Sequence, residues 1–231
     1  MRTRVFRGAV VLLALAIFAS APHRASAVTY SDSTGDTFPV NGIMDITSVE
    51  VTHNATDIIF KINLNGNPTA DDWGKYMIGI DSTGGGDSSG NAWARPISMP
   101  GMDWWIGSWA DSGNGAEVWK YTGSWGLQSA TYASNPDNVG LTKDTSSVTI
   151  KFAYAGLGLT TFKFDVYTSG GGGGDGAVDA LGNPNQTIAD WGNSYDSGTL
   201  VNTYTIPEPS SLVLVGMSGL MLTGLLFRRR A

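Results

Sequence analysis

Residues 45–65 have the sequence DITSVEVTHNATDIIFKINLN, and this stretch decides the fold class. Apolar residues stand at every second position on both sides of the tetrapeptide at 53–56, a period that is typical of strands with one buried face. A short polar connection between two such strands predicts an antiparallel hairpin. We therefore expect strands at Asp45–Thr52 and Asp57–Asn65.

The same alternation recurs along the chain and predicts further strands. These lie at Tyr76–Asp81, Trp104–Trp109, Glu117–Tyr121, Val148–Tyr154, Phe162–Val166 and Leu200–Ile206. About eight strands with one apolar face each must bury those faces against one another, which predicts an all-β, two-sheet antiparallel β-sandwich that is jelly-roll-like. Residues 154–159 are expected to form one helical turn, and the Gly/Ser-rich stretches 82–91 and 169–176 to form surface loops.

The charge of the central part of the chain limits its partners. Between residues 28 and 206 there are 19 acidic and seven basic side chains, a net charge of −12. Such a surface repels phosphate backbones, so we expect no nucleic-acid partner. It suits solubility, cation binding or contact with neutral sugars. The chain has no cysteine, which excludes disulfides and a thiol nucleophile.

The N-terminus has the three parts of a secretory signal peptide. Arg2, Arg4 and Arg7 precede an almost wholly apolar run at 9–21, and small residues at 25–27 suit signal peptidase. We expect cleavage after Ala27; a permanent N-terminal anchor is the alternative. The chain then divides into a signal peptide at 1–27, a β-sandwich domain at 28–206 and a tail at 207–231.

The C-terminus carries a second apolar segment. Sixteen uncharged residues, 212–227, directly precede three arginines at 228–230. A helix from Ser210 to the end of this run would be about 27 Å long, close to the ~30 Å hydrocarbon core of a bilayer. The positive-inside rule predicts that the arginines stay cytoplasmic while the body lies on the far side. Pro207 and Pro209 predict an extended peptide between body and helix.

This tail resembles the PEP-CTERM sorting signal over Ile206–Ala231. The residues that carry the resemblance are Pro207, Glu208, Pro209, Arg228, Arg229 and Arg230. It implies recognition by an exosortase, an integral membrane cysteine transpeptidase, with cleavage near the Pro-Glu-Pro. It also implies a Gram-negative, exopolysaccharide-producing host, transient anchoring in the inner membrane, and final display at the cell surface or release from it. A simple C-terminal membrane anchor is the alternative.

The order of motifs in the body is similar to that of family 9-like carbohydrate-binding modules, including the C-terminal binding region of glucodextranase-type proteins. The resemblance covers Asp32 to about Phe164. It rests on Asp32-x3-Asp36, Asp45-Ile46-Thr47, the strand from Ile58 to Ile62 and the strand from Tyr76 to Asp81. It implies a jelly-roll sandwich, often with a structural calcium near the N-terminal acidic loop. The glycine-rich insertions depart from the family pattern.

Tryptophan is concentrated in one part of the body. Six of the eight tryptophans fall between positions 93 and 125. Exposed indole rings can stack on the C–H faces of sugars, and on a strand Trp105 and Trp109 would share a face about 13 Å apart. The alternative is that these side chains belong to the core. The candidate carbohydrate-binding residues are Trp93, Arg95, Asp103, Trp104, Trp105 and Trp109.

Three aspartates near the start of the body are candidate metal ligands. Asp32, Asp36 and Asp45 supply hard oxygen donors in a loop, as calcium requires. They predict a structural calcium as the cofactor. Solvated surface carboxylates are the alternative.

The sequence favours a noncatalytic protein. His53 is the single histidine of the body, and no serine-nucleophile motif accompanies it. Glu50 and Glu117 are the body's two glutamates, outside any glycosidase-like run. An aspartate pair such as Asp71–Asp72 stays open as a catalytic alternative.

Two functions therefore remain. One is an exported, exosortase-sorted surface protein whose body binds polysaccharide. The other is a structural matrix protein without a specific ligand, in which the tryptophans are core.

Overall fold

The computed structural model describes residues 27–37, 42–111, 113–154, 159–183 and 190–206. The predicted signal peptide, apart from Ala27, lies outside these residues. So do residues 155–158 of the turn predicted at 154–159, and the sorting residues Pro207, Glu208, Pro209 and Arg228–Arg230. No helix of the described part is long and apolar enough to cross a lipid bilayer.

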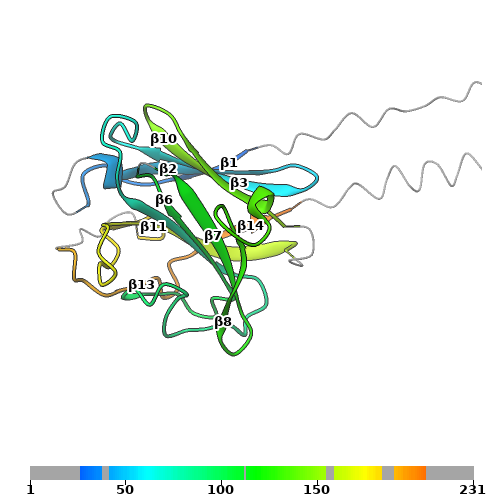
Figure 1. Ribbon diagram of the computed structural model, residues 1–231. Helices are drawn as coiled ribbons and strands as arrows, with labels where there is room; N and C mark the ends of the chain where they lie inside the picture. The colour runs from blue at the N-terminus through cyan, green and yellow to red at the C-terminus, as the bar shows by residue number, and fades with distance from the viewer. Residues whose placement is uncertain (1–26, 38–41, 112, 155–158, 184–189, 207–231) are drawn as a thin grey trace, which may run out of the picture.

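The protein is all-β, and two antiparallel sheets pack face to face (Figure 1). The first sheet has the order β1-β2-β3-β10-β9, with bounds Val28–Ser31, Ile46–His53, Asp57–Leu64, Ser147–Ala153 and Val139–Lys143. The second has the order β12-β11-β4-β6-β7-β8, with bounds Asp179–Ala180, Thr161–Ser169, Lys75–Asp81, Trp104–Trp109, Gly115–Tyr121 and Trp125–Ala130. Strand β14 (Asn202–Thr205) pairs with β11.

Four short elements complete the described fold. Strands β5 (Ile97–Ser98) and β13 (Tyr195–Asp196) form a parallel pair. The 3-10 turns η1 (Gly42–Met44) and η2 (Pro136–Asn138) lead into β2 and β9.

The main core fills the space between the two sheets. It takes alternate residues from strands of both, which is the burial that the period of two predicts. Phe60 of β3 and Phe164 of β11 meet across it edge to face, with ring centroids 5.2 Å apart. The sandwich therefore buries one face of every long central strand.

The predicted hairpin is confirmed: β2 pairs antiparallel with β3, from Ile46 opposite Leu64 to His53 opposite Ile58. The other predicted strands are also present, although β14 is shorter than the predicted 200–206. Strands β1, β8 and β9 and the two-residue strands β5, β12 and β13 were not predicted.

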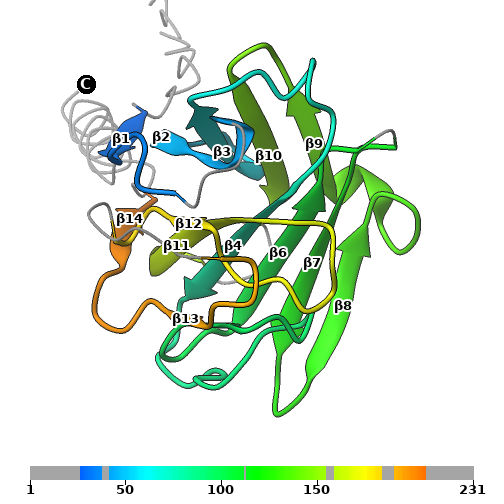
Figure 2. The ribbon, with the colours of Figure 1, turned by 90° about the vertical axis from the view of Figure 1, so that its left-hand side faces the viewer.

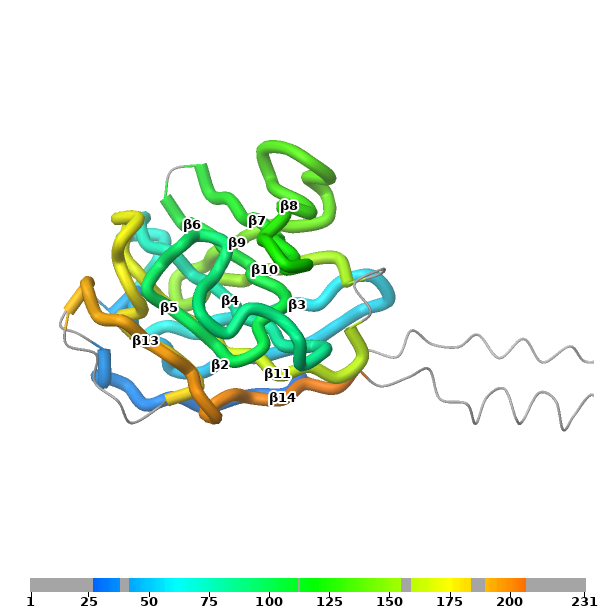
Figure 3. The backbone as a smooth tube through the Cα atoms, turned by 90° about the horizontal axis from the view of Figure 1, so that it is seen from below, coloured from blue at the N-terminus to red at the C-terminus, as the bar shows by residue number. Residues whose placement is uncertain are grey.

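The outer face of the second sheet is also covered. The segments before β6 and after β11, which include β5 and β13, lie over it and enclose a second core (Figure 3). Its buried members include Met77, Trp105 and Tyr167 from the sheet and Ile97 and Tyr195 from the covering segments. From Phe164 to Ser169, β11 is consequently buried on both faces.

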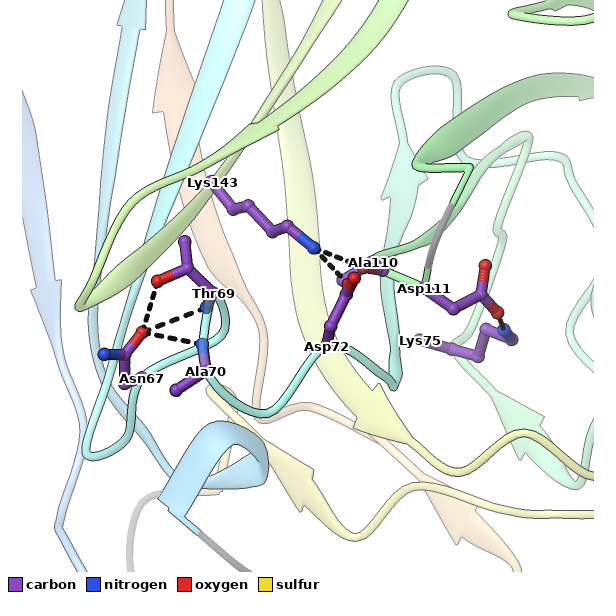
Figure 4. A network of polar contacts seen from close by, with 8 residues as sticks. All are labelled: Asn67, Thr69, Ala70, Asp72, Lys75, Ala110, Asp111 and Lys143. Atoms are coloured by element: carbon purple, nitrogen blue, oxygen red, sulfur yellow. Dashed lines mark hydrogen bonds and ion pairs between the residues drawn. The ribbon is translucent and has the colours of Figure 1, made fainter.

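Two lysine side chains bind the loops before β4 and after β6 (Figure 4). Lys143 of β9 donates to the Asp72 carboxylate and, at 2.6 Å, to the carbonyl oxygen of Ala110, which follows β6. Lys75 pairs with Asp111 at 3.0 Å. Asp72 thus takes part in a bridge between the two sheets.

The first and last strands lie close together although they belong to different sheets (Figure 2). The Tyr30 hydroxyl of β1 donates to the carbonyl oxygen of Thr203 in β14 at 2.7 Å. Both ends of the described body therefore lie at one edge of the sandwich.

Candidate functional site

The outer face of β6 and β7 carries a group of aromatic side chains. Trp109 lies over Gly115 of the paired strand, where a Cβ atom would stand 2.0 Å from the indole ring. Trp93, from the covering segment, lies in the same way over Gly107, with a hypothetical Cβ 2.2 Å from its ring. The absence of side chains at these two glycines lets both indoles lie flat against the sheet.

The Glu117 carboxylate orients three of these aromatic side chains. It is 8 % exposed, and its Oε2 accepts hydrogen bonds from Trp93 Nε1 at 2.8 Å and Trp119 Nε1 at 2.7 Å. Its Oε1 accepts a hydrogen bond from the Tyr132 hydroxyl. This hydrogen bond raises the pKa of Tyr132 to about 12. Three donors on one buried carboxylate fix the positions of the rings.

The rings form a continuous group. Trp93 and Trp109 have centroids 6.5 Å apart, and Trp109 and Tyr132 have centroids 6.1 Å apart. Tyr132 is 64 % exposed, the highest value among the large hydrophobic side chains in the described residues. Trp125 lies farther along the hairpin and donates to Asp87 at 3.0 Å.

A shallow pocket of about 300 Å³ opens beside this group. Its lining residues are Lys75, Trp93, Arg95, Trp109 and Gly173. Three of the six candidate carbohydrate-binding residues, Trp93, Arg95 and Trp109, therefore meet at one place. Trp105 and Trp109 do share a face of β6, since both contact the Trp93 ring.

The prediction that the other three candidates contact a sugar is wrong, because their side chains are buried. Trp104 is 2 % exposed and belongs to the core between the sheets, while Trp105 is fully buried and stacked on Tyr167. Asp103 is 5 % exposed, and its carboxylate accepts hydrogen bonds from Ser82 and Thr83. Asp103 thus holds the start of a loop, and none of the three side chains is accessible to a sugar.

A second group of polar side chains lies where the first connection meets β2 and β12. Carboxylate oxygens of Asp36, Asp45 and Asp179 lie within 4.8 Å of one another, and all three residues are buried. Asp36 is 8 % exposed, and neither of its carboxylate oxygens has a hydrogen-bond partner among the described residues. A buried, unpartnered carboxylate is destabilising unless a cation or a proton compensates it.

The neighbours of Asp36 are held in place by hydrogen bonds from backbone N–H groups and from one side-chain amide. Asp45 accepts from Gly35 N at 3.0 Å and from Asn65 Nδ2 at 2.9 Å. Asp179 accepts from the backbone N–H of Ile46 at 2.6 Å and from that of Ala180 at 2.8 Å. Two fixed carboxylates and one unpartnered carboxylate thus share a small volume.

The electrostatics of this group follow from burial and mutual repulsion. Burial, together with the charges of Asp36, Asp165 and Asp45, raises the pKa of Asp32 to about 7. Burial and the charge of Asp32 raise the pKa of Asp179 to about 9. The pKa of Asp36 is raised by the same two causes, burial and a neighbouring carboxylate. A divalent cation would reverse these shifts, because it favours the charged carboxylates.

The residues present fit calcium. Asp36 and Asp45 were predicted as ligands, and the fold adds Asp179, which is 134 positions from Asp45 in the sequence. Asp32 lies near enough to interact electrostatically with them, and its Oδ2 is also buried and has no hydrogen-bond partner in the part of the chain that the structure describes. Three or four carboxylates supply hard oxygen donors, as calcium prefers, and carbonyl groups or water would complete the shell.

Sequence reasoning missed several residues of these sites, including Tyr132. Glu117 stood out only as one of two glutamates in the body, and Lys75 only as one of seven basic residues. Asp179 had no signal in the sequence. Of the aspartate pair left open for catalysis, Asp72 pairs with Lys143. The body's histidine, His53, lies 2.7 Å from the Tyr204 hydroxyl through Nδ1.

No protein-family model, curated protein or solved structure matches this chain.

Proposed function

We propose that the body is a noncatalytic carbohydrate-binding domain and that the aromatic group around Glu117 binds the saccharide. The observation that carries the proposal is the buried Glu117 carboxylate, which orients Trp93, Trp119 and Tyr132 through three hydrogen bonds. Rings that are already fixed lose little conformational entropy when a ligand stacks on them.

The chemistry of the group suits a sugar. A saccharide presents apolar C–H faces between polar hydroxyl groups. The half-buried indoles of Trp93 and Trp109 match the first, and donors from Lys75 and Arg95 match the second. Ligand sites that combine apolar walls with a few placed polar groups are typical of small-molecule recognition.

The strand order supports the fold that belongs to this proposal. The chain passes from one sheet to the other between β3 and β4, between β8 and β9, and between β10 and β11. We infer a jelly-roll-like sandwich from these crossings, the fold implied by the resemblance to family 9-like carbohydrate-binding modules.

The proposed cellular role rests on the sequence of the two ends. The N-terminal arginines and apolar run support export, and the Pro-Glu-Pro, apolar and arginine-rich parts of residues 207–230 support sorting by an exosortase. The protein would pass through the inner membrane, be anchored there by its C-terminal helix, and reach the cell surface or matrix. There the body would bind exopolysaccharide.

A glycan array probed with the full chain tests the binding proposal. We expect binding that is reduced at least tenfold in Trp109→Ala, because the stacking surface is lost. Tyr154→Ala is the control, since Tyr154 directly follows β10, a strand of the other sheet. Absence of binding to every saccharide, or equal losses in both variants, would contradict the proposal and favour a matrix protein without a specific ligand.

We also propose that calcium occupies the acidic cluster of Asp36, Asp45 and Asp179. The unpartnered carboxylate of Asp36 carries this second proposal. The ion would link the loop before β2 to β12, and its role would be structural. Ligand binding to the folded state alone raises stability by mass action.

Thermal unfolding with calcium, magnesium or EDTA tests the metal. We expect calcium to raise the Tm of the wild type by several degrees relative to EDTA, and magnesium to raise it less, since its coordination geometry is stricter. Asp36→Asn should remove most of the response, and Asp137→Asn, at an exposed acid of η2, should keep it. A Tm that is the same in calcium and EDTA would refute the proposal.

A further inference from the structure

Arg95 is a buried cation without a carboxylate partner. The residue is 6 % exposed, although arginine is among the residues least often buried. Within the described residues, no carboxylate oxygen lies within ion-pair distance of its guanidinium group. A charge removed from water in this way is destabilising unless something compensates it.

The protein supplies neutral hydrogen-bond acceptors to one nitrogen of Arg95. Nη1 donates to Ser169 Oγ at 2.8 Å and to the carbonyl oxygen of Asp175 at 2.9 Å. The charge of Asp175 acts on the guanidinium from a greater distance and partly offsets the lowering of its pKa by burial. Nε and Nη2 make no hydrogen bond to the described residues. Part of the donor capacity of Arg95 is therefore available to a ligand.

The uncompensated cation lines the aromatic pocket. The guanidinium carbon of Arg95 lies 5.6 Å from the centroid of the Trp93 ring, which fixes the plane of the cation beside the indole. Lys75 lines the same pocket, and its ammonium group has three donors, of which Asp111 occupies one. Gly173 also lines the pocket and has no side chain to fill it. Two cations and two indoles thus surround about 300 Å³.

The pocket is exceptional in the charge distribution of the body. Residues 28–206 hold seven basic and 19 acidic side chains, and two of the seven line this pocket. Long-range repulsion of an anion by the acidic body is screened over about 8–10 Å at physiological salt, so the groups in contact decide what binds. Those groups favour a ligand with a negative charge and an apolar ring face.

We propose that the pocket binds an acidic saccharide, whose carboxylate contacts Arg95 and Lys75 while a ring of the same ligand stacks on Trp109. This inference rests on the proposed carbohydrate-binding function and names its substrate class. The planar donors of arginine match a carboxylate better than they match hydroxyl groups, and charge-assisted hydrogen bonds are about twice as strong as neutral ones.

Isothermal titration of the full chain in mild detergent tests the substrate class. The probes are trigalacturonate and the same trisaccharide with its carboxyl groups reduced to alcohols, so that ring number and linkage are unchanged. We expect the acid to bind at least tenfold more tightly than the neutral form. We also expect this preference to weaken as salt is raised from 50 to about 500 mM, because screening reduces the attraction.

Two variants separate the site from the charge of the whole protein. Lys75→Gln should lower the preference for the acid, and Lys151→Gln, which removes an exposed lysine from β10 in the other sheet, should not. Arg95→Gln should abolish the preference. Since Arg95 is buried and its replacement can unfold the chain, Lys75→Gln provides the decisive measurement.

The outcomes distinguish this inference from the function on which it rests. Equal binding of the acidic and neutral trisaccharides, or equal effects of Lys75→Gln and Lys151→Gln, would overturn the acidic-saccharide proposal and leave carbohydrate binding intact. If neither trisaccharide binds and the glycan array is also negative, the carbohydrate-binding function itself fails.

Discussion

At the scale of single residues, the neighbouring indoles of Trp104 and Trp105 have different surroundings from the indole of Trp109. The first two point to opposite faces of β6, and each enters a core because the second sheet is covered on both sides. Trp109 is the last residue of the strand and is half-buried. The alternation of β6 correctly predicted which side chains share a face. It could not predict that the outer face is also covered.

The different surroundings predict different effects of truncation. Trp104→Ala should lower the free energy of unfolding by about 3–5 kcal/mol, as expected when a large aromatic side chain is removed from a packed core. Trp109→Ala should lower it less, because its ring is partly exposed, and should reduce saccharide binding. Urea denaturation compares the two variants, and equal losses of stability would contradict the assignment of Trp109 to the ligand surface.

At the scale of elements, the period of two predicted the central strands and missed strands at the edges of the sheets. Strand β1 has four residues, none of them fully buried, and β9 contains a glycine and two polar residues. Such strands are specified by the neighbour with which they pair, so their own sequences show no alternation. The pairing of β8 with β7 is in addition interrupted by a register shift between Val118 and Trp119.

The glycines of β6 and β7 lead to an element-scale prediction. Gly115→Ala should displace the Trp109 indole, because the new Cβ would lie 2.0 Å from the ring, and should weaken saccharide binding about tenfold, or about 1.4 kcal/mol. Gly126→Ala on β8 is the matched control. There the nearest atom to a new Cβ is 3.7 Å away, an ordinary contact. Calorimetric titration measures both variants, and an unchanged affinity in Gly115→Ala would count against Trp109 as a ligand contact.

At the scale of the whole molecule, several buried carboxylates couple stability to pH. Asp165 of β11 is fully buried and accepts hydrogen bonds from Ser197 and from the backbone N–H groups of Val166 and Gly182. Burial raises its pKa from 3.8 to about 7. The folded protein therefore keeps a proton that the unfolded chain releases between these pH values.

The sign of the resulting pH dependence follows from this difference. Between about pH 4 and pH 7 the folded state binds more protons than the unfolded state, so the free energy of unfolding should decrease as pH rises through that window. Urea denaturation in EDTA measures this decrease. Asp165→Asn should make the decrease shallower. Asp87 and Asp144, whose pKa values are lowered, are present in both proteins, so the difference between the two pH profiles gives the contribution of Asp165. Identical pH profiles would contradict the prediction.

The contact between Tyr30 of β1 and Thr203 of β14 determines which edge of the sandwich can be attached to a membrane. The two proposed cleavage points, after Ala27 and near Pro207, adjoin these strands, so both cuts would be made at the same edge of a finished sandwich. Whether the body is tethered at its N-terminal end, its C-terminal end or both, the same edge of the sandwich would lie next to the membrane. Strand β8 lies at the opposite edge in Figure 2 and would face away from the tether.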